Sequence, residues 1–285
     1  MEASVITGKA PTANASYTNI LGVPISAVDM NGAVQTIADW IKRKRRHYVC
    51  VCNVHTVMEC QKDEATREVY REAGMVTPDG MPLVWVSRLM GKPDVRRVYG
   101  PDLMLEVFEK SVKEGWRHFF YGGAPGVAND LAAKMRERFP GLQIAETICP
   151  PFRALTAAEE VDVVNRINQS GADIVWVGIG APRQELWMAK HRRSLEASVL
   201  VGVGAAFDFL SGVKPQAPRW MMNSGLEWLF RLGSEPKRLW RRYEVYNPLF
   251  VWQVILQFAG LRRYDDKLPK RDGSQDGVSR ASDLV

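Results

Sequence analysis

The sequence is poor in metal-binding residues and lacks the motifs of several common enzyme classes. Its four histidines, His47, His55, His118 and His191, have no spacing typical of a metal site. It contains neither the Gly-x-Ser-x-Gly motif of serine hydrolases nor the His-Glu-x-x-His motif of zinc proteases. It also has no Asp-x-Asp, the pattern with which many nucleotide-dependent transferases hold a divalent ion. We therefore expect no bound metal and no other cofactor.

Cysteines and long hydrophobic runs are also scarce. Three of the four cysteines, Cys50, Cys52 and Cys60, lie close together, and with Cys149 they form no zinc-ribbon pattern, so we expect reduced thiols in a cytosolic protein. The apolar stretch 248–261 is about 14 residues long and reaches about 20 Å as a helix, short of the roughly 30 Å bilayer core. Residues 1–17 contain an early glutamate and no apolar segment, which is unlike a secretory signal.

Charge is unevenly distributed along the 285 residues, and this divides the chain. Residues 214–263 contain nine Lys or Arg against three Glu, a surplus equal to the net charge of the whole chain, +6. We predict a loose lead-in at 1–16, an α/β core at 17–213, a basic, Trp-rich helical appendage at 214–263 and a disordered polar tail at 264–285. A local excess of positive charge indicates a local anionic partner.

Short apolar runs alternate with helical patterns throughout the predicted core. The predicted strands are 47–52, 75–77, 118–123, 142–147, 173–180 and 198–208. Strands that alternate with helices predict a Rossmann-like, mostly parallel sheet flanked by helices. Apolar runs such as "IVWV" fit strands that are covered on both faces.

Polar or glycine-rich loops follow most of these predicted strands. In a parallel sheet, ligands bind beside the carboxyl ends of the strands, so we expect the loops to share one edge. The residues concerned are Asn53, Asp79, Gly122, Gly123, Gly180, Gln184 and Asp208.

Each of these motifs also has a structural interpretation. "YGGAPG" could present backbone amides to a phosphate at a helix start, or could be a tight turn. Asp79 in "TPDG" fits a type I turn, but a carboxylate at this edge can also act as a general base. Gln184 can donate and accept hydrogen bonds, and Asp208 needs either a backbone cap or a ligand hydroxyl as its partner.

The appendage contains four of the nine tryptophans and most of its basic residues are arginines. We predict three helices there, at about 218–232, 235–246 and 248–261. Cationic, Trp-rich amphipathic helices suit a membrane interface, and arginines bind phosphates through paired hydrogen bonds. The alternative is a charged helical cap that packs on the core. No motif for nucleic-acid binding is present.

Seven blocks of this sequence resemble the WecG/TagA/CpsF family of bacterial glycosyltransferases, across about residues 20–245. They are "CNVHTV", "TPDGMPLVW", "RVYGPDLM", "FFYGGAPGVANDLAAKM", "VGIGAPRQELW", "GVGAAFDFLSG" and "APRWMMNSGLEWLFRLGSEPKRLWRRY". The resemblance implies inverting, metal-independent transfer of a sugar from a UDP-sugar to a polyprenyl-diphosphate-linked acceptor, at the cytoplasmic face of the plasma membrane. Donors of the N-acetylmannosamine and glucuronic acid types are both compatible with it.

The resemblance also implies roles for particular residues. Asp79 matches the general base, Asn53 and Gln184 match pocket residues, and the appendage is expected to contact the membrane. Arginines of the appendage are expected to bind diphosphate, and the matching positions are Arg231, Arg238, Arg241 and Arg242. Many members have Thr at the position of Val51, so this chain lacks that hydroxyl. Gly122, Gly123, Gly180 and Asp208 complete the expected nucleotide-sugar site.

Two other functional classes fit the same pattern of strands. A nucleotide-dependent oxidoreductase would bind NAD(P), although the dinucleotide motif Gly-x-Gly-x-x-Gly is missing. A non-catalytic peripheral membrane adaptor would bind vesicles but not UDP-sugars. The sequence leaves homo-oligomer formation open.

Overall fold

The computed structural model describes residues 16–265, without the side chains of Arg238, Arg241 and Arg242. The predicted lead-in at 1–16 and tail at 264–285 therefore lie almost wholly outside the described residues.

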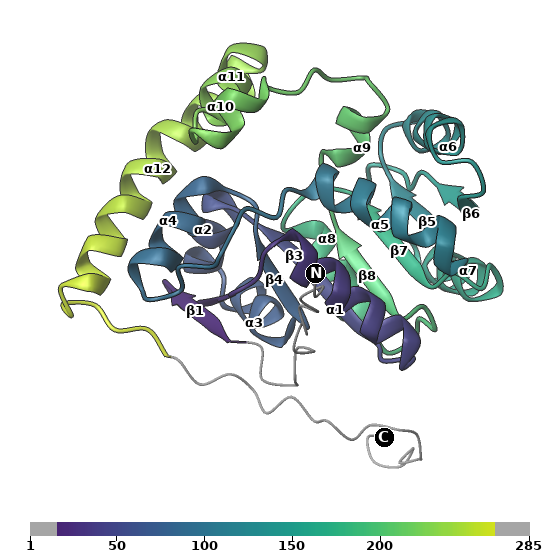
Figure 1. Ribbon diagram of the computed structural model, residues 1–285, viewed down its shortest axis with the longest axis horizontal. Coiled ribbons are helices and arrows are strands. Elements are labelled where there is room, and N and C mark those ends of the chain that lie inside the picture. Colours follow the sequence, from purple (N-terminus) through teal and green to yellow (C-terminus); the bar gives the residue numbers. More distant parts are fainter. Residues whose placement is uncertain (1–15, 266–285) are drawn as a thin grey trace, which may run out of the picture.

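Six parallel strands form the central sheet, in the order β4-β3-β8-β7-β5-β6 (Figure 1). Because every strand runs in the same direction, all six carboxyl ends lie at one edge. This confirms the predicted α/β fold with a mostly parallel sheet. The strands are β3 (His47–Cys52), β4 (Met75–Pro78), β5 (Arg117–Gly122), β6 (Gln143–Ile148), β7 (Ile174–Gly178) and β8 (Val199–Gly202).

Helices cover both faces of the sheet. In β7, Val175 and Val177 pack into one apolar layer and Trp176 into the other, which explains the continuous apolar run of this strand. One layer contains side chains of α1 (Met30–Lys42), α5 (Gly100–Glu114), α6 (Val127–Arg138) and α9 (Ala206–Leu210). The other contains side chains of α2 (Val54–Lys62), α3 (Glu64–Glu72), α4 (Met81–Leu89), α7 (Ala157–Gln169) and α8 (Arg183–His191).

Two predicted element boundaries are wrong. The apolar run 198–208 is not one strand, because β8 ends at Gly202 and residues 206–210 form α9. Gly204, with a φ of +53°, lies in the turn between them. The pattern of residues 56–74 also predicts a single helix after β3, but the structure has two. Asp63 accepts a 2.9 Å hydrogen bond from the backbone N–H of Thr66 and so begins α3 as a new helix.

A two-stranded antiparallel sheet precedes the core, and the sequence patterns above did not reveal it. It consists of β1 (Tyr17–Ile20) and β2 (Val23–Ser26). Its turn contains Leu21, which is fully buried.

The appendage differs from the three predicted helices. The first of them is two short helices, α10 (Arg219–Asn223) and α11 (Glu227–Ser234), separated at Gly225 with a φ of +75°. The other two form one continuous helix, α12 (Pro236–Phe258), which runs through Pro248. Proline removes one backbone donor, but Pro248 is exposed, and Tyr246 and Phe250 on either side pack against the core.

The carboxyl-terminal half of α12 is attached to the core (Figure 1). Phe250 and Val254 are buried in the same layer as α2. The side chain of Gln257 accepts a 3.0 Å hydrogen bond from the N–H of Leu21 and donates a 2.8 Å bond to the carbonyl of Asn19. Gln257, a polar residue within the apolar stretch 248–261, therefore joins the helix to the β1-β2 turn. Between residues 16 and 265, no helix has the length and hydrophobicity needed to cross a bilayer.

Candidate active site at the carboxyl edge of the sheet

Asn53 and Asp79 lie next to each other because β3 and β4 are paired neighbours. The N–H of Asp79 donates a 2.8 Å hydrogen bond to the carbonyl of Cys52, and a Cβ at Gly80 would lie 3.6 Å from that of Asn53. The structure thus brings together the first two predicted site residues.

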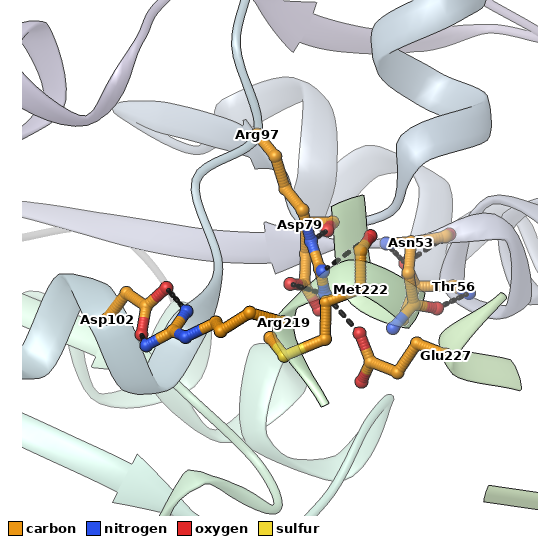
Figure 2. Close-up of polar contacts among 8 residues, drawn as sticks. All are labelled: Asn53, Thr56, Asp79, Arg97, Asp102, Arg219, Met222 and Glu227. Atoms are coloured by element: carbon orange, nitrogen blue, oxygen red, sulfur yellow. Dashed lines mark hydrogen bonds and ion pairs between the residues drawn. The ribbon is translucent and has the colours of Figure 1, made fainter. Parts of the chain in front are cut away.

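Asn53 begins helix α2 as its N-cap. Its Oδ1 accepts a 3.3 Å hydrogen bond from the N–H of Thr56, and the Thr56 hydroxyl accepts a 2.9 Å bond from the N–H of Asn53 (Figure 2). This reciprocal capping box fixes the orientation of the Asn53 side chain beside Asp79. Asn53 therefore has a local structural role whether or not it also binds a ligand.

Asp79 is bound by Arg97, a residue that sequence reasoning did not single out. The Arg97 Nη2 lies 3.4 Å from Oδ1 of Asp79, and its Nε donates to the Asp79 carbonyl (Figure 2). Arg97 also stacks on Tyr99, with its guanidinium carbon 4.4 Å from the ring centroid. The signal was available in the matched block "RVYGPDLM", which contains both residues. This anchored guanidinium fixes the carboxylate at the edge of the sheet.

Burial raises the pKa of Asp79 from 3.8 to about 6. Arg97 and Arg231 lower this pKa, whereas the negative charge of Glu227 raises it. Above pH 6 the carboxylate is mostly ionised and remains a stronger base than a solvent-exposed aspartate. These are the properties that a general base requires near neutral pH.

Helices α10 and α11 lie against the same site. Glu227 of α11 contacts Nη2 of Arg97, and Nη1 of Arg97 lies 3.4 Å from the carbonyl of Met222 (Figure 2). Arg219 of α10 forms two hydrogen bonds with Asp102, at 2.6 and 2.8 Å. The appendage is therefore joined to the core by ion pairs around Asp79.

Of the four predicted arginines, the structure describes the side chain of Arg231 alone. Arg231 is partly buried on α11, with its guanidinium carbon 5.7 Å from the centroid of Phe209. Its positive charge lowers the pKa of Asp79. The backbone positions of Arg238, Arg241 and Arg242 are in α12, but their side chains lie outside the described residues.

Gln184 is buried at the start of α8, where it fixes the turn after β8. Its Oε1 accepts a 3.0 Å hydrogen bond from the N–H of Gly204, and its Nε2 donates a 2.8 Å bond to Glu185. The loop "GIGAPRQE" is thus polar at Gln184 because this side chain holds the backbone at Gly204, and polar at Glu185 because its carboxyl group accepts a hydrogen bond from Gln184. A role of Gln184 toward a sugar nucleotide remains a prediction.

Glu185 is fully buried, and burial raises its pKa from 4.5 to about 7. Because the folded protein holds this proton more tightly than the unfolded chain, the contribution of Glu185 to the free energy of unfolding falls as pH rises from 4.5 to 7 and then levels off.

We expect Glu185→Gln to reduce this pH dependence. The free energy of unfolding should change less between pH 5 and pH 8 than in the unsubstituted protein, by on the order of 2 kcal/mol. Denaturant unfolding at the two pH values measures the difference. Glu109→Gln, at an exposed site on α5, provides the control. Equal pH dependence in all three proteins would contradict a neutral Glu185 in the fold.

The glycines at the carboxyl ends of β5 and β7 differ in how closely other atoms approach them. A Cβ at Gly122 would lie 2.5 Å from the backbone carbonyl of Gly178, so the two strand ends approach too closely for any side chain. Gly123 donates a 3.0 Å hydrogen bond to the carbonyl of Gly178. These contacts support the tight-turn interpretation. Gly180, with a φ of +83°, borders open space, because a Cβ at this position would have no other atom within 4 Å.

Asp208 has a charged partner that the sequence did not indicate. Its carboxylate forms a 2.9 Å ion pair with Lys214, which also lies 3.3 Å from Glu235 at the start of α12. The chain turns back after α9, and the N–H of Lys214 bonds to the Asp208 carbonyl at 3.0 Å. The observed partner is thus a lysine that connects the core to the appendage. A role of Asp208 toward a sugar nucleotide stays a prediction.

In the part of the chain that the structure describes, no three His, Cys, Asp or Glu side chains are grouped so that they could hold a metal ion. The charged groups around Asp79 are instead two arginines, Arg97 and Arg231, and one glutamate, Glu227. They lie at the carboxyl edge of the parallel sheet, where ligands bind in folds of this kind.

Comparison with known proteins agrees with this interpretation. The profile of the glycosyl transferase WecG/TagA/CpsF family matches residues 18–264, and the chain belongs to this family. It is therefore a glycosyltransferase, and neither the oxidoreductase nor the adaptor alternative is supported.

Two relatives from different bacteria have the same name, N-acetylglucosaminyldiphosphoundecaprenol N-acetyl-beta-D-mannosaminyltransferase. The protein from Bacillus spizizenii is 31% identical over 216 residues, which cover 76% of this chain and 81% of the relative. The protein from Staphylococcus aureus MW2 is 25% identical over 243 residues, which cover 85% and 93%.

Proposed function

We propose that this chain transfers N-acetylmannosamine from its UDP conjugate to N-acetylglucosaminyl-diphosphoundecaprenol, in the synthesis of a bacterial cell-surface polysaccharide. The activity named for the two relatives supports the sugar and the acceptor. The observation that carries the proposal within this structure is the buried Asp79 at the carboxyl edge, held by Arg97.

The proposed reaction inverts the anomeric carbon of the donor. Asp79 accepts the proton of the acceptor hydroxyl while that oxygen forms a bond to the anomeric carbon from the face opposite UDP. The bond between the anomeric carbon and the diphosphate oxygen breaks, and UDP leaves with the electron pair. Arg231 and the other arginines of the appendage stabilise the negative charge that develops on the diphosphate. The step requires no metal, in agreement with the missing Asp-x-Asp motif.

The outer surface of α11 and α12 is proposed to contact the cytoplasmic face of the membrane. An apolar groove of about 770 Å³ lies between these helices, lined by Trp228, Leu229, Leu232, Tyr243, Glu244, Asn247, Pro248, Val251, Trp252 and Ile255. Trp252 and Ile255 are more than half exposed. Exposed aromatic and aliphatic side chains on a basic segment are suited to a surface of anionic lipids.

We expect Trp252→Ser combined with Ile255→Ser to weaken binding to anionic vesicles at least about tenfold, because both side chains lose their burial among lipids. Cosedimentation with vesicles of phosphatidylglycerol and phosphatidylcholine measures this binding. Phe152→Ser is the matched control, since Phe152 is 79% exposed but lies in the loop after β6, the strand farthest from β4 in the sheet. Equal binding by the double variant and the control would show that Trp252 and Ile255 do not contact the membrane.

Product analysis tests the proposed reaction directly. The enzyme is incubated with a short prenyl-diphosphate-N-acetylglucosamine and separate UDP-sugars, including UDP-N-acetylmannosamine and UDP-glucuronic acid. Mass spectrometry should detect the acceptor extended by one N-acetylmannosamine in the first reaction. If only UDP-glucuronic acid extends the acceptor, the donor is UDP-glucuronic acid and the proposed donor is wrong. If no UDP-sugar extends the acceptor, the proposed reaction is wrong. UDP, but not NAD, should raise the melting temperature.

A further inference from the structure

Two carboxylates share one guanidinium at the site. Nη2 of Arg97 contacts both Oδ1 of Asp79, from the core, and Oε2 of Glu227, from the appendage. All three side chains are largely shielded from solvent, with exposed fractions of 13% for Arg97, 17% for Asp79 and 16% for Glu227. The ion pair is therefore much less screened than one on the surface.

We infer that Glu227 is a positioning residue for the base: it orients Arg97 against Asp79 when the appendage is docked, and so couples docking to proton transfer. This inference rests on the proposed role of Asp79 as general base. It assigns a role to an acidic residue of the appendage, in addition to the phosphate binding proposed for the arginines of the appendage.

The position of Glu227 is fixed by packing of the appendage. Met222 of α10 and Ala217 are buried with Tyr99 in a small apolar cluster, against which Phe230 of α11 packs. Glu227 precedes Phe230 by three residues, so the two side chains lie on neighbouring parts of one helical face. Docking of this cluster brings Glu227 to Arg97, whose backbone belongs to the core.

Several charged or titratable groups face Asp79 from the surrounding elements. They are Arg97 and Tyr99 before α5, Cys52 of β3, and Glu227 and Arg231 of α11. Of these, Glu227 is the carboxylate whose charge raises the pKa of Asp79. Its removal lowers this pKa for two reasons: a negative neighbour is lost, and Arg97 is left to pair with Asp79 alone. Asp79 then becomes a weaker base, ionised at lower pH.

The test is the pH dependence of kcat/KM between pH 4.5 and 9, measured with UDP-N-acetylmannosamine and the short prenyl acceptor. For Glu227→Gln we expect the acidic limb to move to lower pH by at least about 0.5 unit. The plateau should fall by roughly tenfold, because the base is weaker and its partner less well oriented. Glu227→Asp keeps the charge and should restore the acidic limb to its original pH.

Glu137→Gln is the matched control, because Glu137 is exposed on α6 and remote from Asp79 in the fold. Limited proteolysis of the linker at 211–218 reports whether the appendage stays docked. An acidic limb that is unmoved in Glu227→Gln, with a plateau equal to that of the control, would overturn the inference. So would loss of activity at every pH with a newly cleaved linker, since Glu227 would then only hold the appendage. If the unsubstituted enzyme transfers no sugar, the proposed function fails instead.

Discussion

Asp79→Asn should lower the turnover number for sugar transfer by at least about 100-fold, because loss of a general base typically costs two to four orders of magnitude. The substitution preserves the shape of the side chain, so the hydrogen bond from the N–H of residue 79 to Cys52 is retained. The measurement is kcat at saturating donor and acceptor, at pH 7.5, where the native carboxylate with a pKa of about 6 is ionised.

The control for this substitution is Asp39→Asn, which removes an exposed carboxylate on α1 that pairs with Arg43. Exposed pairs of this kind contribute little to stability, so the control should keep its activity. An Asp79→Asn variant that retains full turnover and a normal melting temperature would show that another group removes the proton.

Arg231→Glu should lower kcat/KM by about 100-fold or more. The substitution replaces a positive charge that acts on the site with a negative charge, which repels both the ionised base and the leaving diphosphate. It should also raise the pKa of Asp79, so the acidic limb of the pH profile should move to higher pH, opposite to the direction expected for Glu227→Gln. Steady-state kinetics across the pH range measures both effects.

Arg193→Glu provides a matched change of charge at the other edge of the sheet, in the exposed turn that follows α8. It should leave kcat/KM within about twofold of the original value, as exposed charge changes far from the site are weakly felt. If Arg231→Glu is as active as this control, the cation that faces the diphosphate must be one of the other arginines of the appendage.

The central part of the site could be predicted from the sequence because it depends on local rules. Strands that alternate with helices place their carboxyl ends together, and this is sufficient to bring Asn53 beside Asp79. The parallel sheet could be predicted for the same reason, because each strand is a short apolar run that is followed by a helical pattern. The role of the glycines after β5 was left open by the sequence, and the close approach of Gly122 to Gly178 supports the structural interpretation.

Unlike Arg231, the partners Arg97 and Glu227 could not be predicted from local patterns, because their roles depend on contacts between distant segments. Arg97 lies in a connection without helical or strand periodicity, and Glu227 is 130 residues further along the chain. The burial of Gln184 and Glu185 could not be predicted from the sequence either, since polar residues at a helix start are usually exposed. The continuity of α12 through Pro248 depends on packing of the helix against the core, which overrides the local preference of proline.

Helix α12 is held at both of its ends. Near its start, Lys214 bridges Glu235 to Asp208 of the core, and near its finish Gln257 is bonded to the β1-β2 turn. A helix held at both ends does not move freely relative to the core. The lipid surface proposed to lie against it would therefore keep a constant tilt and height relative to Asp79. With the proposed membrane contact, we therefore expect the enzyme to reach acceptor sugars only at one height above the bilayer.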